Sequence, residues 1–521
     1  MPETNLSAKS QKWYRGLDRY CWIVLIIAAL GWLFDTMDQN LYNLVRKPSL
    51  TSMIAPHYSE ANIPQDQKDK IRKEEFAKSP KASYQAVDEA TNRRVRTEVR
   101  KLVDADVSQK GGWINAIFLI GWAVGGFGFG IIGDRLGRVK TMVTTILIYA
   151  IFTGLSGLAT NWWLYAIARF LTALGVGGEW AAGAALVAEV FPQRSRAMAL
   201  GSLQALSAVG NMMACVITLI IGNLEQYWYV AYFIGFLPAI MVFWVLRTVK
   251  EPAAWHEAKA KASLDKEMGA ISELFSNVKL RRNTIVAILL ATAGVGGLWG
   301  IGFFSTDMIM GELRSAYDWS AMSPELTAAT NKWIGRQNSL MFLVQQVGAF
   351  FGIYLFAVVA ERVSRRSAFA LWFVIAWASV LGYFWLLAGS GKNAFVLGMM
   401  MAPVLGFGTL GPFSGFTVYF PELFPTRLRA TGCGIGYNAA RIFAAPCALM
   451  LGNLSKWYAG YGFAGGNAFA MAATTISTIY IVGFIGLAFA PETKGKALPE
   501  DKDFEVGSRH FEPAMAEAGA R

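Results

Sequence analysis

Long apolar runs, separated by short polar connectors, dominate this chain. Each run is long enough to cross a bilayer as a helix, which requires about 20 predominantly apolar residues. The runs lie at about 21–46, 112–132, 141–160, 162–188, 197–222, 226–247, 284–309, 338–360, 367–389, 393–420, 430–452 and 466–490. The pattern therefore predicts an all-α membrane protein with twelve transmembrane helices.

Two short motifs occur once in each half of the chain, in the same order. The first lies at Gly130–Lys140, between two apolar runs, and a degenerate copy lies at 357–366. The first copy carries Gly130, Asp134, Arg135, Gly137 and Arg138, and the second carries Glu361, Arg362 and Arg365. The second motif carries Glu189, Arg194 and Arg196 in one copy and Glu422, Arg427 and Arg429 in the other. Because repeated motifs indicate repeated structure, we predict two pseudo-symmetric halves of six helices each.

The connectors predict the domain organisation and its orientation in the membrane. We expect a leader (1–20), an N-terminal half (21–247), a central connector (248–283), a C-terminal half (284–490) and a tail (491–521). Lys and Arg concentrate in connectors that alternate to one side, which the positive-inside rule assigns to the cytoplasm. The leader is basic and the number of spans is even, so we expect both termini to be cytoplasmic. The first run is long enough to remain a helix rather than a cleaved signal.

One long insertion, residues 47–110, is polar and carries both charges on the expected outer side. Segments of this length cross the membrane largely regardless of their charge. The composition of 67–77 and 84–105 is compatible with helices. We expect a small helical cap over the entrance, or else a mobile insertion with no role in transport.

The composition excludes several classes of protein. With 54% hydrophobic and only 16% charged residues, the chain is too apolar for an ordinary soluble protein of 521 residues. Its net charge of +12 does not indicate nucleic-acid binding, because the cations lie mainly in connectors beside the apolar runs. The four cysteines lack metal-ligand spacing. We find no phosphate loop or nucleophile–base pair, and we therefore expect neither an enzyme nor a cofactor or metal.

Several motifs of this chain resemble those of a known protein family. Gly130–Lys140 resembles the Gly-x-x-x-Asp-Arg-x-Gly-Arg-Arg/Lys signature of the major facilitator superfamily. The second motif and Pro491-Glu-Thr-Lys-Gly495 resemble the branch that holds sugar, aromatic-acid, sialate/lactate and organic-ion carriers. The resemblance implies alternating access by a monomeric carrier in the cell (inner) membrane. It also implies that salt bridges at the inner face hold the outward-open state. The residues that it assigns to them are Asp134, Arg138, Glu361 and Arg365, joined by Glu189, Arg194, Glu422 and Arg427.

Acidic residues inside apolar runs are candidates for carrying a proton. Asp35 and Asp38 lie three residues apart in the first run and share a helix face. Two close carboxylates in a low dielectric do not ionise together easily, so one of them can carry a proton. They resemble the first-helix acids of proton-coupled aromatic-acid and sialate carriers. The alternative is that they pack against neighbouring Asn or Tyr side chains.

Glu179 lies in a Gly-Gly-Glu-Trp run of the fourth helix, after Arg169. Similar runs occur in proton-linked organic-acid carriers. Glu179 is therefore either a second protonatable site or the partner of Arg169 in a buried pair.

Arg441 in the eleventh helix is the candidate substrate anchor. It shares a face with Asn438 and has no acid within a turn. A carboxylate substrate would supply a bidentate partner, and the position resembles the helix-eleven Arg of organic-anion carriers. The alternative is an ion pair with Asp35, Asp38 or Glu179 across the halves. Uncharged candidates for the substrate cavity are Gln204, Asn211, Gln345 and Gln346.

We therefore predict a proton-coupled symporter of a small organic anion, such as a monocarboxylate or an aromatic acid, in a lipid bilayer. One alternative is a sugar or polyol proton symporter. Another, from a different class, is a transport-dead membrane sensor or scaffold that uses residues 47–110 to bind a ligand.

Overall fold

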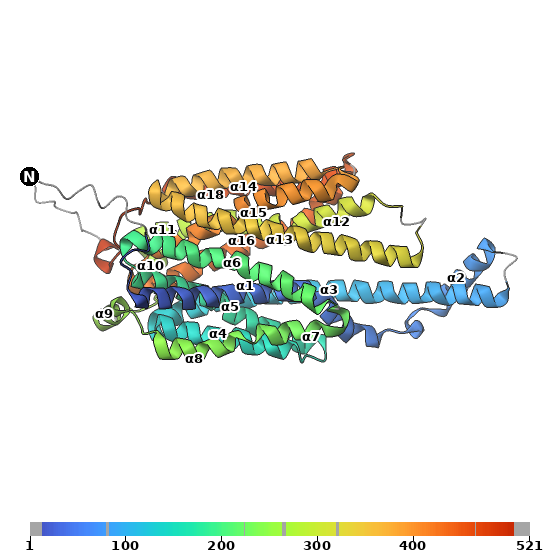
Figure 1. The fold of residues 1–521 in the computed structure, drawn as a ribbon, viewed down its shortest axis with the longest axis horizontal. Coiled ribbons are helices and arrows are strands. Elements are labelled where there is room, and N and C mark those ends of the chain that lie inside the picture. Colours follow the sequence, from blue (N-terminus) through green and yellow to red (C-terminus); the bar gives the residue numbers. More distant parts are fainter. Residues whose placement is uncertain are drawn as a thin grey trace, which may run out of the picture.

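The fold consists of helices alone within the described part of the chain (Figure 1). The computed structural model describes residues 13–79, 83–222, 224–262, 267–318, 322–463 and 465–504. The N-terminal half contains α1 (Arg19–Ile54), α3 (Tyr84–Leu136), α4 (Arg138–Ser156), α5 (Trp162–Val190), α6 (Gln193–Ile221), α7 (Leu224–Gly235) and α8 (Pro238–Thr248). The C-terminal half contains α11 (Val278–Gly300), α12 (Ser305–Ser315), α13 (Pro324–Arg362), α14 (Arg365–Leu387), α15 (Ala394–Tyr419), α16 (Arg429–Gly460), α17 (Gly466–Ser477) and α18 (Tyr480–Phe489). Parts of the expected leader and tail, residues 1–12 and 505–521, lie outside the described residues.

The helices match the predicted apolar runs. Eleven described helical segments are long and apolar enough to cross a membrane. The twelfth predicted span is α16, whose polar Asn438 and Arg441 lower its hydropathy. The predicted all-α fold with two six-helix halves is therefore confirmed.

Three predicted spans are interrupted. Pro238 begins α8 after a turn, which divides the sixth span into α7 and α8. The seventh span breaks after Gly300 and continues through the 3-10 helix η3 (Gly302–Phe304) into α12. Glycine is a poor helix former, and this stretch carries several glycines in close succession. The last span divides between α17 and α18, for which we have no physical account.

The two halves meet along two seams of equivalent helices. One seam packs α3 against α16, and the other packs α6 against α13. At Gly126 of α3, a Cβ atom would collide with the side-chain amide of Asn438. At Gly201 of α6, a Cβ atom would collide with the methyl group of Ala357 on α13. Small residues therefore bring the backbones of the two halves close together, as expected in membranes, where packing drives helix association.

The insertion between α1 and α3 forms an arm that projects from one end of the bundle (Figure 1). It contains α2 (Gln65–Lys78), which packs on the first part of α3 around Ile63, Ile71 and Val95. The helices predicted in this segment are present. The expected cap is wrong, because α3 continues straight outward and carries α2 away from the bundle instead of across it. Ion pairs between Arg94 and Glu74 (2.7 Å) and between Arg72 and Asp88 (3.0 Å) join the two arm helices.

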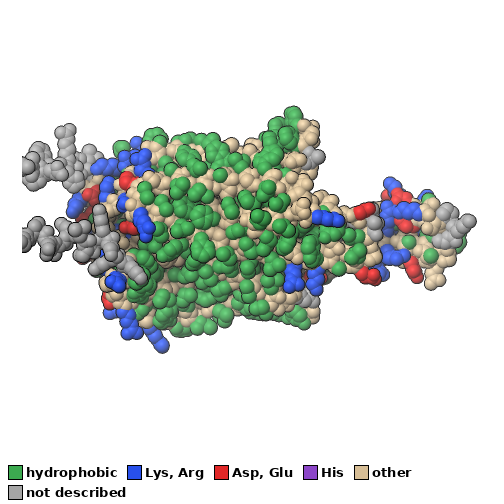
Figure 2. Space-filling model, turned by 45° about the horizontal axis from the view of Figure 1, so that its top comes forward, with side chains coloured by type: hydrophobic (Ala, Val, Ile, Leu, Met, Phe, Trp, Pro, Cys, Tyr) green, Lys and Arg blue, Asp and Glu red, His purple; other side chains and the backbone are tan. Residues whose placement is uncertain are grey.

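The surface of the bundle carries an apolar belt, and charged side chains lie beyond it at both ends and on the arm (Figure 2). Large hydrophobic side chains that are exposed include Ile240, Phe243 and Val374. Lys and Arg side chains gather at the end of the bundle opposite the arm. We call this the motif end, because the loops with both repeated motifs lie there, and we call the other the arm end. The belt is the surface that a multi-pass membrane protein presents to lipid.

Candidate functional site

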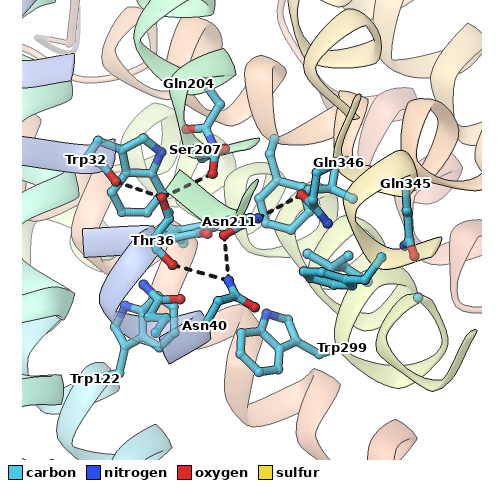
Figure 3. A pocket seen from close by; sticks show the side chains of 17 residues that line it. Trp32, Thr36, Asn40, Trp122, Gln204, Ser207, Asn211, Trp299, Gln345 and Gln346 are labelled. Carbon is cyan, nitrogen blue, oxygen red and sulfur yellow. Dashed lines mark hydrogen bonds between the residues drawn. The ribbon is translucent and has the colours of Figure 1, made fainter. Parts of the chain in front are cut away.

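A small cavity lies between the two halves in the middle of the bundle (Figure 3). Its volume is about 60 Å³, which is below the 300–1,000 Å³ or so of typical ligand pockets. Its walls are lined by Trp32, Thr36, Gln39, Asn40, Trp122, Gln204, Ser207, Asn211, Leu298, Trp299, Gly302, Phe342, Gln345, Gln346, Leu410, Phe413 and Tyr437. These residues come from α1, α3 and α6 in one half and from α11, η3, α13, α15 and α16 in the other. A small-molecule substrate therefore requires the halves to separate from this arrangement.

A chain of amide hydrogen bonds crosses the cavity from one half to the other. Asn40 Nδ2 donates to Asn211 Oδ1 (2.5 Å), and Asn211 Nδ2 donates to Gln346 Oε1 (2.8 Å). Gln204 joins the halves in a second place, since its Oε1 accepts from Trp180 Nε1 (3.2 Å) and from Thr417 Oγ1 (2.8 Å). Gln345 Oε1 accepts from Ser305 Oγ (3.1 Å). All three predicted glutamines thus line the cavity, and Asn40 joins them without having been predicted.

Arg441 lies directly behind the aromatic wall of this cavity. Its guanidinium carbon is 3.8 Å from the ring centre of Trp122 and 4.3 Å from that of Tyr437, and both rings line the cavity. One nitrogen donates to Asn438 Oδ1 (2.7 Å). The buried Nε and Nη2 have no hydrogen-bond partner in the described part of the chain, and Arg441 forms no ion pair there. Cation–π contacts support the charge on two sides, but its donors are left for an anion.

Asp38 forms a fully buried ion pair with Arg169. The distance between Asp38 Oδ2 and Arg169 Nη2 is 3.0 Å, and neither side chain is exposed. The Arg169 guanidinium also lies against the rings of Tyr42 (4.9 Å) and Tyr232 (5.5 Å). The alternative in which Arg169 pairs with Glu179 is therefore wrong, because Arg169 pairs with Asp38 and no described residue donates a hydrogen bond to Glu179.

Asp35 and Glu179 form the second acidic group of the N-terminal half. Both are buried, and none of their four carboxyl oxygens accepts a hydrogen bond from the described residues. Glu179 lies beside α1 at Gly31, one turn before Asp35. The charge of Asp35 interacts with that of Glu179 and with that of Arg441 across the halves. A buried carboxylate without donors is costly, so these two acids are the groups best suited to hold protons.

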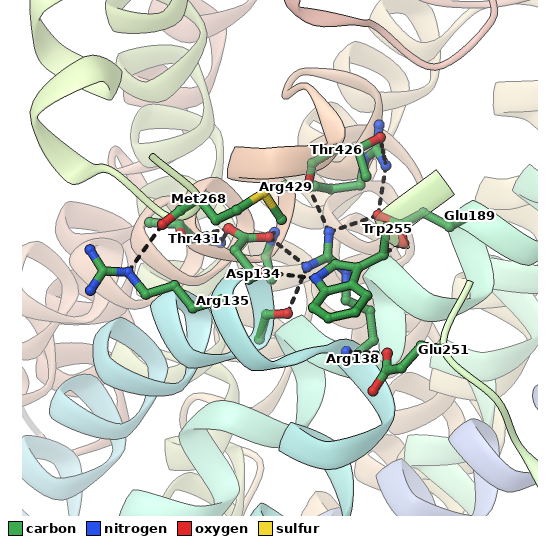
Figure 4. Close-up of polar contacts among 12 residues, drawn as sticks. Asp134, Arg135, Arg138, Glu189, Glu251, Trp255, Met268, Thr426, Arg429 and Thr431 are labelled. Carbon is green, nitrogen blue, oxygen red and sulfur yellow. Dashed lines mark hydrogen bonds and ion pairs between the residues drawn. The ribbon is translucent and has the colours of Figure 1, made fainter. Parts of the chain in front are cut away.

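The first motif ties the two halves together at the motif end (Figure 4). Asp134 accepts hydrogen bonds from the backbone N–H of Ala430 (3.1 Å) and of Thr431 (2.8 Å), and from Thr431 Oγ1 (2.6 Å). These groups lie in the first turn of α16, where a carboxylate is favourable. We call this set of contacts, together with those of Arg138 and Glu189 below, the lock.

Arg138 and Glu189 complete the lock. Arg138 pairs with Asp134 (2.8 Å) and Glu189 (2.9 Å), and it also donates to the carbonyl oxygen of Thr426 (2.6 Å). Glu189 in turn pairs with Arg429 of the other half (2.7 Å). All four charged side chains are unexposed, so these pairs act in a low dielectric and join the two halves at the motif end.

The second copy of the motif makes contacts within its own half. Arg365 pairs with Glu422 (2.9 Å) and Glu361 (3.2 Å). Glu361 remains partly exposed and does not reach α6 in the way that Asp134 reaches α16. The degenerate copy therefore contributes no ion pair between the halves among the described residues.

Three arginines of the motifs, Arg135, Arg194 and Arg427, take no part in the lock. The family resemblance had assigned Arg194 and Arg427 to these salt bridges. Arg427 pairs with Asp501 (2.6 Å) and Glu273, and so ties the tail and the central connector to the C-terminal half. Arg194 donates to the carbonyl oxygen of Arg15 (2.8 Å) in the leader. Arg135 donates to the connector at Met268 O (3.1 Å). Arg429, the last arginine of the motif, makes the contact with Glu189.

The sequence of this chain matches the profile of a known protein family. The profile of the Major Facilitator Superfamily matches residues 103–446, which is more than half of the chain. The chain belongs to the Major Facilitator Superfamily. This membership makes it a multi-pass membrane transporter rather than an enzyme, as the sequence predicts.

Curated relatives in this superfamily include carriers of organic acids. A probable 4-methylmuconolactone transporter of Cupriavidus pinatubonensis is 30% identical over 390 residues, which cover 74% of this chain and 83% of that protein. A sialic acid transporter of Escherichia coli is 28% identical and covers 71% of this chain and 84% of its own. Among solved structures, a proton:xylose symporter of the superfamily has a TM-score of 0.63, 17% identity, and coverage of 93% and 99%. That likeness shows the fold alone.

Two acids that cap helices in this superfamily member were not among the predicted site residues. Glu251 accepts from the backbone N–H groups of Arg138 (2.7 Å) and Lys140 (3.1 Å) at the start of α4. Its carboxylate occupies the space that a Cβ atom of Gly137 would need, and Gly137 has a φ of 119°, which favours glycine. Glycine is thus required at this turn for two reasons.

Glu492 is the counterpart of Glu251 in the other half. It accepts from the backbone N–H groups of Arg365 (3.1 Å) and Arg366 (3.2 Å) at the start of α14. Burial alone would raise the pKa of Glu492, but N–H donors from Lys494, Arg365 and Arg366 hold it below its usual value. The signal for both acids was present in the sequence, because each lies beside a proline just after the last helix of its half.

The lock leads to a prediction that a native cysteine can report. Cys433 is unexposed and lies on α16 within electrostatic range of Asp134 and Arg429. Asp134→Asn weakens the contacts to α16, so we expect the motif end to open more often. In a variant whose other three cysteines are serine, maleimide labelling of Cys433 should become about tenfold faster, which corresponds to about 1.4 kcal/mol.

The matched control for this labelling experiment is Asp88→Asn, which removes an exposed ion pair on the arm. It should leave the labelling rate of Cys433 unchanged. Equal labelling of Cys433 in the Asp134→Asn variant and in the parent protein would show that Asp134 does not keep this end closed.

Proposed function

We propose that this transporter is a proton-coupled symporter that carries a small organic anion, such as a monocarboxylate or an aromatic acid, by alternating access. The observation that carries the proposal is the buried Arg441, whose Nε and Nη2 have no acceptor among the described residues. The named substrates of several relatives, including muconate and niacin in Acinetobacter baylyi, agree with an organic acid.

Arg441 is suited to bind a carboxylate rather than a neutral solute. A guanidinium offers its donors in a fixed fork that matches the two oxygens of a carboxylate. The rings of Trp122 and Tyr437 both lie against the guanidinium, so its position is set before the anion arrives. The same two rings line the cavity, and their movement would bring the guanidinium and the anion together.

Asp35 and Glu179 are the proposed proton carriers, and Asp38 has a different task. Asp38 already has a cationic partner in Arg169, which stabilises its charged form. Asp35 and Glu179 lack any donor among the described residues, and a proton on each would remove an unpaired buried charge. Protons on these acids would therefore accompany the anion across the membrane.

The coupling follows from the charge of Arg441. While Asp35 is ionised, its negative charge partly compensates the guanidinium across the halves. A proton on Asp35 removes that compensation, and the cation then attracts an anion more strongly. Proton and anion would thus favour each other's binding, which is what symport requires.

The motif end would face the cytoplasm, in line with the concentration of Lys and Arg there. The lock would hold the cytoplasmic side closed while anion and proton enter from the arm end. Release of the contacts of Asp134 and Glu189 would then let the two halves rock about the central cavity.

Sugar or polyol symport is the second candidate function. The amide side chains that line the cavity favour it, because amides bind hydroxyl groups well. A neutral sugar, however, leaves the guanidinium of Arg441 without an anion, and the two functions therefore predict opposite effects of removing that charge.

Uptake into proteoliposomes tests the proposal. With an acidic outside, labelled benzoate or lactate should accumulate above its equilibrium level, and glucose should not. Collapse of the pH gradient should abolish the accumulation. Accumulation of glucose alone would replace the proposed function with sugar transport.

A further inference from the structure

The orientation of the cavity amides indicates what the substrate must offer. Asn40 Nδ2 donates to the backbone carbonyl oxygen of Thr36 (3.2 Å), which can only accept. This contact fixes which end of the Asn40 amide carries the N–H groups. Asn211 must then turn its oxygen to Asn40 and its N–H group to Gln346. The chain of bonds therefore ends on Gln346 Oε1, and its amide N–H₂ is left over.

Gln204 is oriented by an independent contact. The indole N–H of Trp180 can only donate, and it points to Gln204 Oε1 at 3.2 Å. The amide N–H₂ of Gln204 is therefore also left over. Neither amide nitrogen donates a hydrogen bond to any described residue, although both side chains are more than nine-tenths buried and line the cavity.

The cavity thus presents donors without matching acceptors on both of its sides. Gln204 belongs to α6 in one half and Gln346 belongs to α13 in the other. Neither nitrogen has an acceptor among the described residues, so a ligand that supplies an acceptor is favoured over one of the same shape that does not. A hydrocarbon surface would leave both donors unsatisfied.

We propose that the transported acid carries, besides the carboxylate for Arg441, a second acceptor group such as a carbonyl, a lactone or another carboxylate, which Gln204 and Gln346 bind. The inference rests on the proposed function and narrows its substrate class to bifunctional acids.

The same amides link this recognition to the movement of the halves. The hydrogen bond from Asn211 to Gln346 joins the halves across a cavity of about 60 Å³, so it must break before a substrate of that size or larger enters. Once it breaks, Asn211 Nδ2 also lacks an acceptor. The second acceptor of the substrate would replace Gln346 Oε1 and join the two halves again. Only a bifunctional acid would then support closure around the substrate.

Two acids of equal charge and nearly equal shape test the proposal. The para substituent of 4-acetylbenzoate contains a carbonyl acceptor, whereas that of 4-isopropylbenzoate contains none. We expect isothermal titration calorimetry on the purified protein to show about fivefold tighter binding of the ketone, the effect of one net hydrogen bond. Gln346→Glu keeps an oxygen for Asn211 but loses the amide donors, and should remove this preference.

A second variant and a control make the outcome decisive. Gln204→Met should also reduce the preference for the ketone, while Arg441→Gln should weaken the binding of both acids. Equal binding of the two acids by the unmodified protein, with both lost in Arg441→Gln, would overturn this inference and leave the proposed function intact. Failure to bind either acid would overturn both.

Discussion

Replacing Arg441 with glutamine is expected to reduce the uptake of an organic anion about 100-fold or more. Truncating one partner of a buried, hydrogen-bonded charge pair costs about 2–5 kcal/mol, and each 1.4 kcal/mol corresponds to a factor of ten. Among the described residues the unmodified side chain donates a hydrogen bond to Asn438 alone, so its loss should leave the helix packing largely intact. Initial uptake rates in proteoliposomes measure the effect, and thermal unfolding checks that the variant is folded.

Two controls separate the role of the guanidinium from that of a positive charge in general. Arg441→Lys keeps the charge but loses the planar fork and the stacking between Trp122 and Tyr437, so uptake should remain low. Arg96→Gln removes an exposed arginine of the arm and should leave uptake unchanged. Uptake at the unmodified rate in Arg441→Gln would exclude an anchoring role for this residue.

The double substitution Asp35→Asn and Glu179→Gln is expected to separate anion movement from proton movement. Both amides are neutral at every pH, so protons can no longer be taken up and released at these positions. Accumulation driven by a pH gradient should be lost completely, while exchange of internal for external anion should continue. In the unmodified protein uptake should increase as the external pH falls, and in the variant it should not respond.

Asp38→Asn is the informative contrast to this variant. It leaves the buried Arg169 without its partner, which typically costs about 3–5 kcal/mol of stability. We therefore expect a lower unfolding temperature for Asp38→Asn but not for the double variant. A double variant that still accumulates anion against its gradient would exclude Asp35 and Glu179 as proton carriers.

The fold could be predicted from the sequence because each membrane helix corresponds to a long apolar run in it. A run such as 162–188 must be predominantly apolar to lie in lipid, and α5 accordingly covers Trp162–Val190. The duplication was equally visible, because charged loop motifs stand out between apolar runs. The breaks in the sixth, seventh and last spans were not predicted, since such a break needs only a few residues and leaves the mean hydropathy high.

The pairing of buried charges could not be predicted from spacing alone. Asp35 and Asp38 share a helix face by spacing, yet one faces Arg169 and the other lies near Glu179. Which partner each acid meets depends on the rotation of α1 against α5, and that rotation is set by small residues such as Gly31. Similarly, the sequence indicated Arg441 as an anion ligand but not the two rings that enclose it.

The continuity of α3 has a mechanical consequence. This single helix of 53 residues begins in the arm and ends beside the lock, a length of about 80 Å. The helix has no break between Tyr84 and Leu136, so a tilt of the N-terminal half would move the arm and the lock together. A small tilt of the N-terminal half becomes a larger displacement at the tip of the arm, far from the membrane. A molecule that binds the tip of the arm would therefore be displaced in each transport cycle and would resist that displacement.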